Sequence, residues 1–284
     1  MILIDISQII IANIMMNSEF KDSKNLNINL IRPMVLMSIK GLNKKFKADY
    51  GKVIIVADSS DSTWRKEIFP YYKIKRTQNK KESLINWAKV NEILSDIHDE
   101  LRDNFPYPVL KVSKAEADDL IASVCKEYGN TDEKILIVSR DKDFTQLQKY
   151  DNIRQWNMID ERWVKTDDPV MFLKEHIIRG DSGDSIPSIL SNDDVFALKI
   201  RQKPIMKKKL EVWLTQDWLE FCDDDMMQRV KRNKTLIDLS NVPERIFNET
   251  INQLNEQEHK PRNRILNYCI KYKLSNIISD IQDF

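Results

Sequence analysis

Short, continuous apolar runs recur along the first half of the chain, and three of them lead into aspartates. The three pairs are Met1–Ile4 with Asp5, Val53–Ala57 with Asp58, and Ile135–Val138 with Asp141 and Asp143. Runs of this length that are rich in β-branched residues are typical of strands buried on both faces of a parallel sheet, although periodicity alone does not exclude a buried helix. Segments with helical spacing separate the runs, so the pattern favours β–α–β units with right-handed crossovers.

The pattern predicts an α/β part followed by a helical part. The expected strands are 1–6, 53–57, 109–112 and 135–138, with short edge strands at 153–156 and 162–165. The expected helices follow the first strand and cover 30–46, 84–101 and 170–178, with a loop around 17–29. Because no convincing strand pattern follows Gly180, we expect an α/β domain over residues 1–180 and a helical region over 181–284.

Composition and charge narrow the class of protein only a little. The 284 residues are 31% charged but sum to a formal +1, so global charge does not indicate a partner. The three cysteines have no CxxC spacing, which argues against a disulfide framework or zinc site and for a reducing compartment. No run approaches about 18 consecutive apolar residues, and the apolar start lacks a basic region and a cleavage site. We therefore expect a soluble, cytoplasmic protein with no membrane span.

Aspartates at the ends of parallel strands would gather at one edge of the sheet, where ligands bind in open α/β folds. Taken singly, each could be an ordinary turn residue or helix cap, and Asp141 is well placed to cap a helix over 144–147. Carboxylates that share one cleft raise one another's pKa unless cations compensate their charge. A metal site is the economical explanation for three strands that end in the same way.

Two further segments carry carboxylates. The sequence Ser113-Lys-Ala-Glu116 has the form of a capping box, which accounts for Glu116 but not for Asp118 and Asp119 in the first turn of the helix that it opens. Helical spacing prevents these three carboxylates from facing one metal equally. The later segment Gly180-Asp181-Ser-Gly-Asp184 could be no more than a turn.

Residues 62–82, called the basic segment below, combine positive charge with aromatic rings. From Trp64 to Glu82 there are seven basic and two acidic residues, with four aromatic residues interspersed. Basic groups neutralise phosphates and aromatic faces stack on bases, which suits a grip on a single strand. The alternative is a solvated loop anchored by a few aromatic side chains. A second run, 201–209, has five basic residues and no acidic ones.

In this order, these segments resemble the motifs of the 5′-nuclease family, which includes flap endonucleases and the 5′-nuclease domains of bacterial polymerases. The matching segments are LIDIS around Asp5, VIVADSS around Asp58, Glu116-Ala-Asp-Asp119, Ser139-Arg-Asp-Lys-Asp-Phe144, Gly180-Asp-Ser-Gly-Asp184, and the arch-like Phe69-Pro-Tyr-Tyr-Lys-Ile-Lys-Arg76. The later DFTQLQKY, RQW and RWVK are especially similar to the branch found in T-even-type phages.

The resemblance implies a PIN-like fold, in which helices flank a mostly parallel sheet, and a two-metal-ion mechanism. It implies a 5′→3′ exonuclease and flap endonuclease with RNase H activity that removes primers during phage DNA replication. Mg²⁺ prefers oxygen ligands, so two Mg²⁺ ions, replaceable by Mn²⁺, suit an all-carboxylate site without histidine. The first ion would be held, partly through waters, by Asp5, Asp58, Asp118, Asp119 and Asp141. The second would take Asp143, Asp181 and Asp184, with Glu116 between the two ions.

The resemblance also implies a nucleic-acid interface. Lys73 and Arg76 would have catalytic roles, in which they steer the 5′ strand and offset charge on the phosphate. The expected nucleic-acid contacts are Arg65, Lys66, Tyr72, Lys73, Lys75, Arg76, Lys203, Lys207, Lys208 and Lys209. We expect a monomer that binds duplex DNA, 5′ flaps and RNA–DNA hybrids with a free 5′ end, and replication proteins such as a single-strand-binding protein or a sliding clamp are further candidate partners.

Two functions other than a nuclease are compatible with acidic residues at a sheet edge. The first is a different magnesium-dependent phosphoryl-transfer enzyme on a doubly wound sheet, such as a phosphatase. Such an enzyme needs a nucleophilic Asp in a DxD motif after the first strand, where this chain reads Asp5-Ile-Ser. A nucleic-acid-binding protein without catalysis would be favoured by a missing carboxylate, and none of the expected carboxylates is missing.

Overall fold

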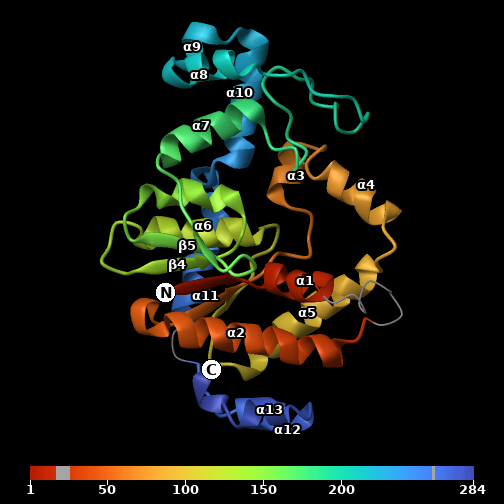
Figure 1. Cartoon of the computed structure of the whole chain (residues 1–284), viewed down its shortest axis with the longest axis vertical. Coiled ribbons are helices and arrows are strands. Elements are labelled where there is room, and N and C mark those ends of the chain that lie inside the picture. The colour runs from red at the N-terminus through yellow and green to blue at the C-terminus, as the bar shows by residue number, and fades with distance from the viewer. Residues whose placement is uncertain (17–25, 258–259) are drawn as a thin grey trace.

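The structure, a computed structural model, describes residues 1–16, 26–257 and 260–284 (Figure 1). Within these residues the centre of the fold is a six-stranded sheet with the order β3-β2-β1-β4-β5-β6. Its strands are β1 (Ile2–Asp5), β2 (Val53–Val56), β3 (Val109–Leu110), β4 (Ile135–Val138), β5 (Ile153–Asn157) and β6 (Arg162–Val164). Most of the loop expected around 17–29 lies outside the described residues.

The predicted mostly parallel sheet is confirmed. Strand β1 lies between β2 and β4 and runs parallel to both, while β6 alone is antiparallel to its neighbour. The prediction that 153–156 forms an edge strand is wrong, because β5 pairs with β4 on one side and β6 on the other. Its polar Gln155 is fully buried, and the amide donates to the backbone oxygens of Ser139 at 2.9 Å and Asp141 at 2.6 Å.

Helices cover both faces of the sheet (Figure 1). The described helices are α1 (Ile6–Met16), α2 (Ile28–Tyr50), α3 (Trp64–Ile68), α4 (Ile74–Glu82), α5 (Trp87–Asn104), α6 (Ala117–Tyr128), α7 (Pro169–Arg179), α8 (Lys207–Thr215), α9 (Trp218–Phe221), α10 (Asp224–Ile237), α11 (Glu244–Glu256), α12 (Ile265–Lys271) and α13 (Ser275–Ile278). Successive strand residues point to opposite faces, so Ile2 and Ile4 pack in the core with α1, α2 and α5, whereas Leu3 packs in the core with α6 and α11.

The C-terminal part is helical, and it packs at three places. Helices α8 and α10 form a third core with α7 (Figure 1), in which Trp213 and Val230 meet Ile178. Helix α11 returns to pack along α6, and α12 joins the core beneath α1 and α2. The predicted domain boundary at residue 180 stays a prediction, since the third core includes residues from both sides of it. None of the helices in the described residues is both long enough and apolar enough to cross a membrane.

Candidate metal centre

The parallel strands deliver aspartates to one edge of the sheet, as expected. Asp5 ends β1, Asp58 follows β2, and Asp141 follows β4. Each carboxylate also accepts a backbone hydrogen bond. Asp5 accepts from Gln8 N at 3.1 Å and Asp141 from Asp143 N at 3.0 Å, both close in the sequence, whereas Asp58 accepts from Ala117 N at 2.9 Å, far along the chain. The capping roles that the sequence allowed are therefore real for Asp5 and Asp141, and they hold these carboxylates at the site rather than replacing it.

Asp118, in the first turn of α6, joins these three aspartates, and we call the four the first carboxylate group. Burial, with the charges of Asp58 and Asp141 added to it, raises the pKa of Asp5 to about 7. Burial and Asp141 likewise raise the pKa of Asp118 well above its ordinary range. Carboxylates that disfavour one another's ionised form in this way lack compensating positive charge, which a bound cation would supply.

The neighbouring Asp119 has a different role. Its Oδ2 accepts hydrogen bonds from Trp64 Nε1 at 3.0 Å and Glu116 N at 2.9 Å, and its Oδ1 lies 2.8 Å from Arg65 Nη2. The side chain is wholly buried. These contacts give Asp119 a structural role, and the prediction that it is a metal ligand stays a prediction.

Helix α6 begins with a different cap from the one predicted. Glu116 is the N-cap and Asp119 completes a capping box three residues later, whereas Ser113 Oγ donates to Asp61 at 2.8 Å. The S-x-x-E motif therefore located the start of the helix correctly, but the N-cap is Glu116 and not Ser113. Glu116 also faces the site, where it meets Lys73 and the hydroxyl of Tyr72.

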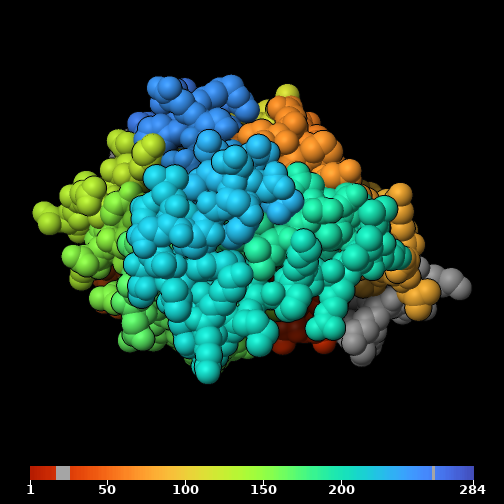
Figure 2. Space-filling model, turned by 90° about the horizontal axis from the view of Figure 1, so that it is seen from above, coloured from red at the N-terminus to blue at the C-terminus, as the bar shows by residue number. Residues whose placement is uncertain are grey.

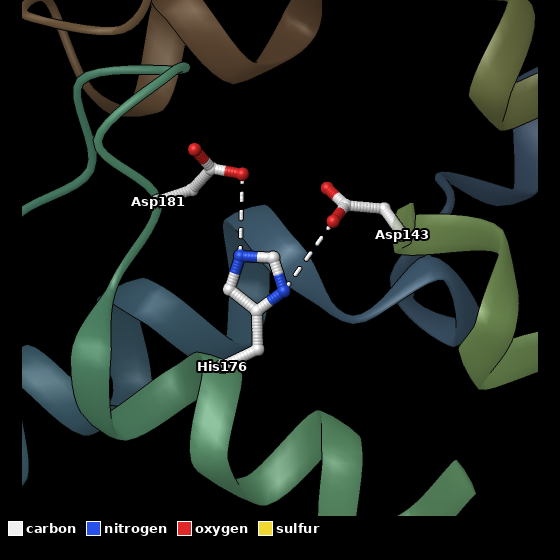
Figure 3. A group of neighbouring side chains, drawn as sticks. All are labelled: Asp143, His176 and Asp181. Carbon is white, nitrogen blue, oxygen red and sulfur yellow. Dashed lines mark hydrogen bonds and ion pairs between the residues drawn. The ribbon is translucent and has the colours of Figure 1, made fainter. Parts of the chain in front are cut away.

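Asp143, Asp181 and Asp184 form a second carboxylate group, and a histidine lies within it. Figure 3 shows His176 of α7 between Asp143 and Asp181. Its Nδ1 lies 3.3 Å from Asp143 Oδ1, and its Nε2 lies 3.2 Å from Asp181 Oδ2. The expectation of a site without histidine is therefore wrong. The sequence does carry one signal for His176, which is its position. It lies in the last turn of a helix, directly before the loop that contains Asp181 and Asp184.

The acidic loop after α7 is held by its own backbone. Gly180 has φ 68°, and a Cβ there would lie 2.3 Å from the carbonyl oxygen of Ile186, so only glycine fits. Asp181 Oδ1 accepts from the backbone N–H groups of Gly183 at 2.6 Å and Asp184 at 3.2 Å. The turn that the sequence allowed is present, and it fixes Asp184 beside the basic segment.

Charge is distributed unevenly in the second carboxylate group. Burial raises the pKa of Asp143 to about 7, although His176 opposes the shift. Burial also acts on Asp181, but hydrogen bonding and the charge of His176 outweigh it and hold the pKa of Asp181 well below its ordinary value. Burial raises the pKa of Asp184 despite the nearby Lys73 and Arg76.

The structure brings Lys73 and Arg76 to the edge of the carboxylates, as expected. Lys73 Nζ contacts Glu116 Oε1 and lies 3.8 Å from Asp184 Oδ2, and Arg76 Nη2 lies 2.6 Å from Asp184 Oδ1. The backbone N–H of Lys73 donates to Asp184 O at 2.7 Å, and Lys73 itself has φ 56°. The base of α4 is thus docked on the acidic loop, and both cations face the site.

Four residues in the first half of the basic segment are buried, which corrects part of the predicted interface. Arg65 and Tyr72 are both 3% exposed and bind Glu116, so they are not available to nucleic acid as predicted. Trp64 and Phe69 are buried too. The aromatic residues therefore mainly anchor the segment, which agrees with the alternative of a loop held in place by a few aromatic side chains. The exposed cations of the segment are Lys66, Arg76, Lys80 and Lys81.

A basic groove lies beside the site, between α4 and the segment 188–205. Its volume is about 630 Å³, and its basic lining residues are Lys75, Arg179, Lys199, Arg201 and Lys203. Figure 2 shows this segment, in teal, next to α4, in orange, and Lys199 Nζ lies 3.2 Å from Glu82 Oε1 at the end of that helix. Lys75 and Lys203 therefore share one surface, while Lys207, Lys208 and Lys209 lie exposed at the start of α8.

Comparison with known proteins gives the same class as the site. Residues 1–175 match the family model of the 5′-3′ exonuclease N-terminal resolvase-like domain, and residues 168–284 match a model of the T4 RNase H C-terminal region. The ribonuclease H of Enterobacteria phage T4 is 32% identical over 291 residues, which cover 99% of this chain and 95% of that protein. The chain therefore belongs to the 5′-3′ exonuclease family, and it is a nuclease.

More distant proteins share the nuclease part and the fold. The flap endonuclease Xni of Shewanella woodyi is 27% identical over 171 residues, which cover 57% of this chain and 63% of that protein. The flap endonuclease of bacteriophage T5, solved in complex with DNA and metal ions, superposes with a TM-score of 0.62 at 18% identity and covers 91% of this chain and 99% of that one. At this identity the likeness establishes the fold.

Proposed function

We propose that this nuclease is magnesium-dependent and works in the 5′→3′ direction on RNA–DNA hybrids, duplex DNA and 5′ flaps, so that it removes primers during phage DNA replication. The observation that carries the proposal is the meeting of two carboxylate groups at one sheet edge, directly beside Lys73 and Arg76. The names of the relatives, a ribonuclease H and a flap endonuclease, support the two substrate classes.

The residues present suit divalent ions. Asp143 Oδ1 is buried and has no hydrogen-bond partner in the part of the chain that the structure describes. Burial and neighbouring carboxylates raise the pKa of Asp5 and that of Asp143 to about 7. Asp5, Asp58, Asp118 and Asp141 would hold one ion, while the second carboxylate group would hold the other. When bound, the two ions supply an activated water and stabilise the leaving oxygen. Oxygen donors of this kind favour Mg²⁺, with Mn²⁺ as a substitute.

Glu116 has a supporting role in this account. It binds Lys73, Tyr72 and Arg65, and despite its burial Lys73 and Arg65 hold its pKa below the ordinary range. An ionised Glu116 keeps Lys73 at the border of the site. Lys73 and Arg76 would then neutralise the scissile phosphate, because both already face the carboxylates that surround it.

The path of the nucleic acid follows from the exposed cations. A single 5′ strand would pass beneath α4, which runs along the outside of the molecule from α3 toward α5 (Figure 1). The duplex would contact the helical region through Lys203 and the exposed start of α8. We further propose that the protein acts as a monomer in the cytoplasm of an infected bacterium, with a single-strand-binding protein or a sliding clamp as candidate partners.

The proposal is tested by digestion of two 5′-labelled substrates side by side in Mg²⁺. An RNA–DNA hybrid should release short labelled products, and a 5′-flap duplex should be cut near its junction. A duplex with a 3′ flap of the same sequence is the control and should keep that flap. If neither 5′ substrate is cut in Mg²⁺ or Mn²⁺, the proposed function is wrong.

A further inference from the structure

We propose that His176 is a nitrogen ligand of the second metal site and that it makes this site favour transition-metal ions over Mg²⁺. The inference rests on the proposed function, in which Asp143, Asp181 and Asp184 form that site. Imidazole is a good ligand for first-row transition ions, whose affinities rise from Mn²⁺ towards Cu²⁺, whereas Mg²⁺ prefers oxygen. One nitrogen donor would therefore shift the choice of ion at one site only.

The position of His176 points to this role. The side chain is 5% exposed and lies on the face of α7 that meets the carboxylates (Figure 3). Its ring makes an edge-on contact with Phe172, with a centroid separation of 5.7 Å and an interplanar angle of 85°. Packing on one side thus orients the ring so that both nitrogens face carboxylate oxygens on the other.

Counting protons shows what these contacts lack. A neutral imidazole has one N–H donor and one acceptor nitrogen. When Nε2–H donates to Asp181 Oδ2 at 3.2 Å, the lone pair of Nδ1 faces Asp143 Oδ1 at 3.3 Å. Both of these facing atoms are buried and have no hydrogen-bond partner among the described residues. Two facing lone pairs need positive charge between them, which either a bound metal ion or a second proton on the ring would supply.

The spacing suits a shared ion. Two ligand atoms at right angles around an ion, with bonds of about 2.0–2.2 Å, lie about 3 Å apart. The 3.3 Å between His176 Nδ1 and Asp143 Oδ1 is close to that value. One ligand atom each from Asp143, His176 and Asp181 lie within 4.8 Å of one another.

The inference gives Asp181 a more specific part. Its Oδ1 already accepts two backbone hydrogen bonds, and its Oδ2 faces His176. Histidines that bind metals commonly donate the other ring N–H to a carboxylate, which fixes the tautomer and the ring orientation. Asp181 would orient His176 in this way, while Asp143 and His176 contact the ion. In the competing arrangement, a doubly protonated ring only holds the two carboxylates, and no ion touches nitrogen.

The test is pulsed electron paramagnetic resonance of the full-length protein loaded with Mn²⁺, which detects ¹⁴N bound to the ion. We expect a histidine ¹⁴N coupling in the wild type and its loss in His176→Gln. His98→Gln is the matched control, because His98 is also buried and also contacts an aspartate, Asp99, but lies on α5 outside both carboxylate groups. Calorimetry on the same variants should show that His176→Gln lowers the ratio of Mn²⁺ to Mg²⁺ affinity by about tenfold or more.

The outcomes separate the inference from the proposed function. Bound Mn²⁺ without a histidine coupling in the wild type would overturn the nitrogen ligand and leave the nuclease assignment intact. Failure of the wild type to bind any divalent ion would overturn both. If His176→Gln does not fold, two other measurements test the nitrogen ligand. They use wild-type protein labelled with ¹⁵N-histidine and the variants His98→Gln and His259→Gln, which each remove one of the other two histidines in the sequence. The coupling must then change on labelling and persist in both of those variants, and any other result contradicts the inference.

Discussion

Arg65 Nη2 lies 2.8 Å from Asp119 Oδ1, and both side chains are buried where α3 meets the start of α6. This ion pair ties the beginning of the basic segment to the helix that presents Asp118 to the first carboxylate group. We therefore expect different roles for these two adjacent aspartates, Asp119 in the structure and Asp118 in metal binding.

Substitution of these neighbours should give opposite phenotypes. Asp119→Ala leaves Arg65 with the more distant Glu116 and should lower the free energy of unfolding by about 3 kcal/mol, because a buried charge loses the closer of these two carboxylate partners. Asp118→Asn should instead keep or raise the stability of the metal-free protein and weaken Mg²⁺ binding. Urea unfolding and calorimetry on both variants provide the measurement. Equal stability of Asp119→Ala and the wild type would refute the structural role.

Metal binding should depend on pH between about 4 and 7. Burial and neighbouring carboxylates raise the pKa of Asp5 and that of Asp143 to about 7, from the ordinary value of 3.8. Within this window the native metal-free protein binds more protons than the unfolded chain. The stability contributed by these two groups therefore falls as pH rises from about 4 and levels off above about 7.

The increase in Tm on adding Mg²⁺ should follow the opposite course. Metals bind deprotonated ligands, so the increase should grow up to about pH 7 and then stay constant. The difference between Tm values with and without Mg²⁺ isolates this effect from other titrating groups. Asp5→Asn should make the difference smaller and less dependent on pH. A constant difference from pH 5 to 8 would show that these carboxylates do not bind the ion.

Lys207, Lys208 and Lys209 should contact duplex phosphates. Their replacement by glutamine should weaken binding similarly for all sequences and flatten the plot of log K against log salt by about 0.9 per lost contact. The control is replacement by glutamine of Lys44, Lys45 and Lys47 on α2, which belong neither to the basic groove nor to α8. This variant loses the same charge and should keep the wild-type slope. If both triple variants have the wild-type slope, the run at α8 is only a solvated face.

The position of α4 predicts that a 5′ strand threads beneath it. A bulky protein adduct on the 5′ end of a flap should slow cleavage sharply, whereas the same adduct on a 3′ end should not. Lys73→Ala with Arg76→Ala should lower turnover more than duplex affinity, since both cations face the carboxylates. Equal cleavage of capped and free 5′ flaps would rule out threading and leave the metal chemistry untouched.

The sequence predicted those parts of the site that depend on local pattern. Asp5, Asp58 and Asp141 could be found because apolar runs mark the strands and parallel strands end at one edge. The choice between Asp118 and Asp119 could not, because it depends on Trp64 and Arg65, which lie more than fifty residues earlier in the chain. Only the folded structure shows that the carboxylate of Asp119, and not that of Asp118, contacts Trp64 and Arg65.

His176 and Gln155 were missed for related reasons. A histidine within an apolar helix has no signature until the helix end and the acidic loop are placed together. The sequence pattern places Gln155 in an edge strand. In the structure its buried amide donates to the backbone oxygens of Ser139 and Asp141 from inside the sheet. Likewise, the aromatic residues of the basic segment predicted base stacking, but burial of Phe69 and Tyr72 was decided by packing with the distant α10.

The most direct test of the account is single-turnover cleavage of a 5′-flap substrate by the wild type and by Asp141→Asn. Asp141 is a suitable choice because it joins the first carboxylate group and caps the turn that carries Asp143. The account predicts that wild-type cleavage disappears in a chelator and returns with Mg²⁺. It also predicts that Asp141→Asn cleaves several orders of magnitude more slowly while it binds DNA about as tightly. A near-normal rate for Asp141→Asn in saturating Mg²⁺ would contradict a metal centre built on these carboxylates.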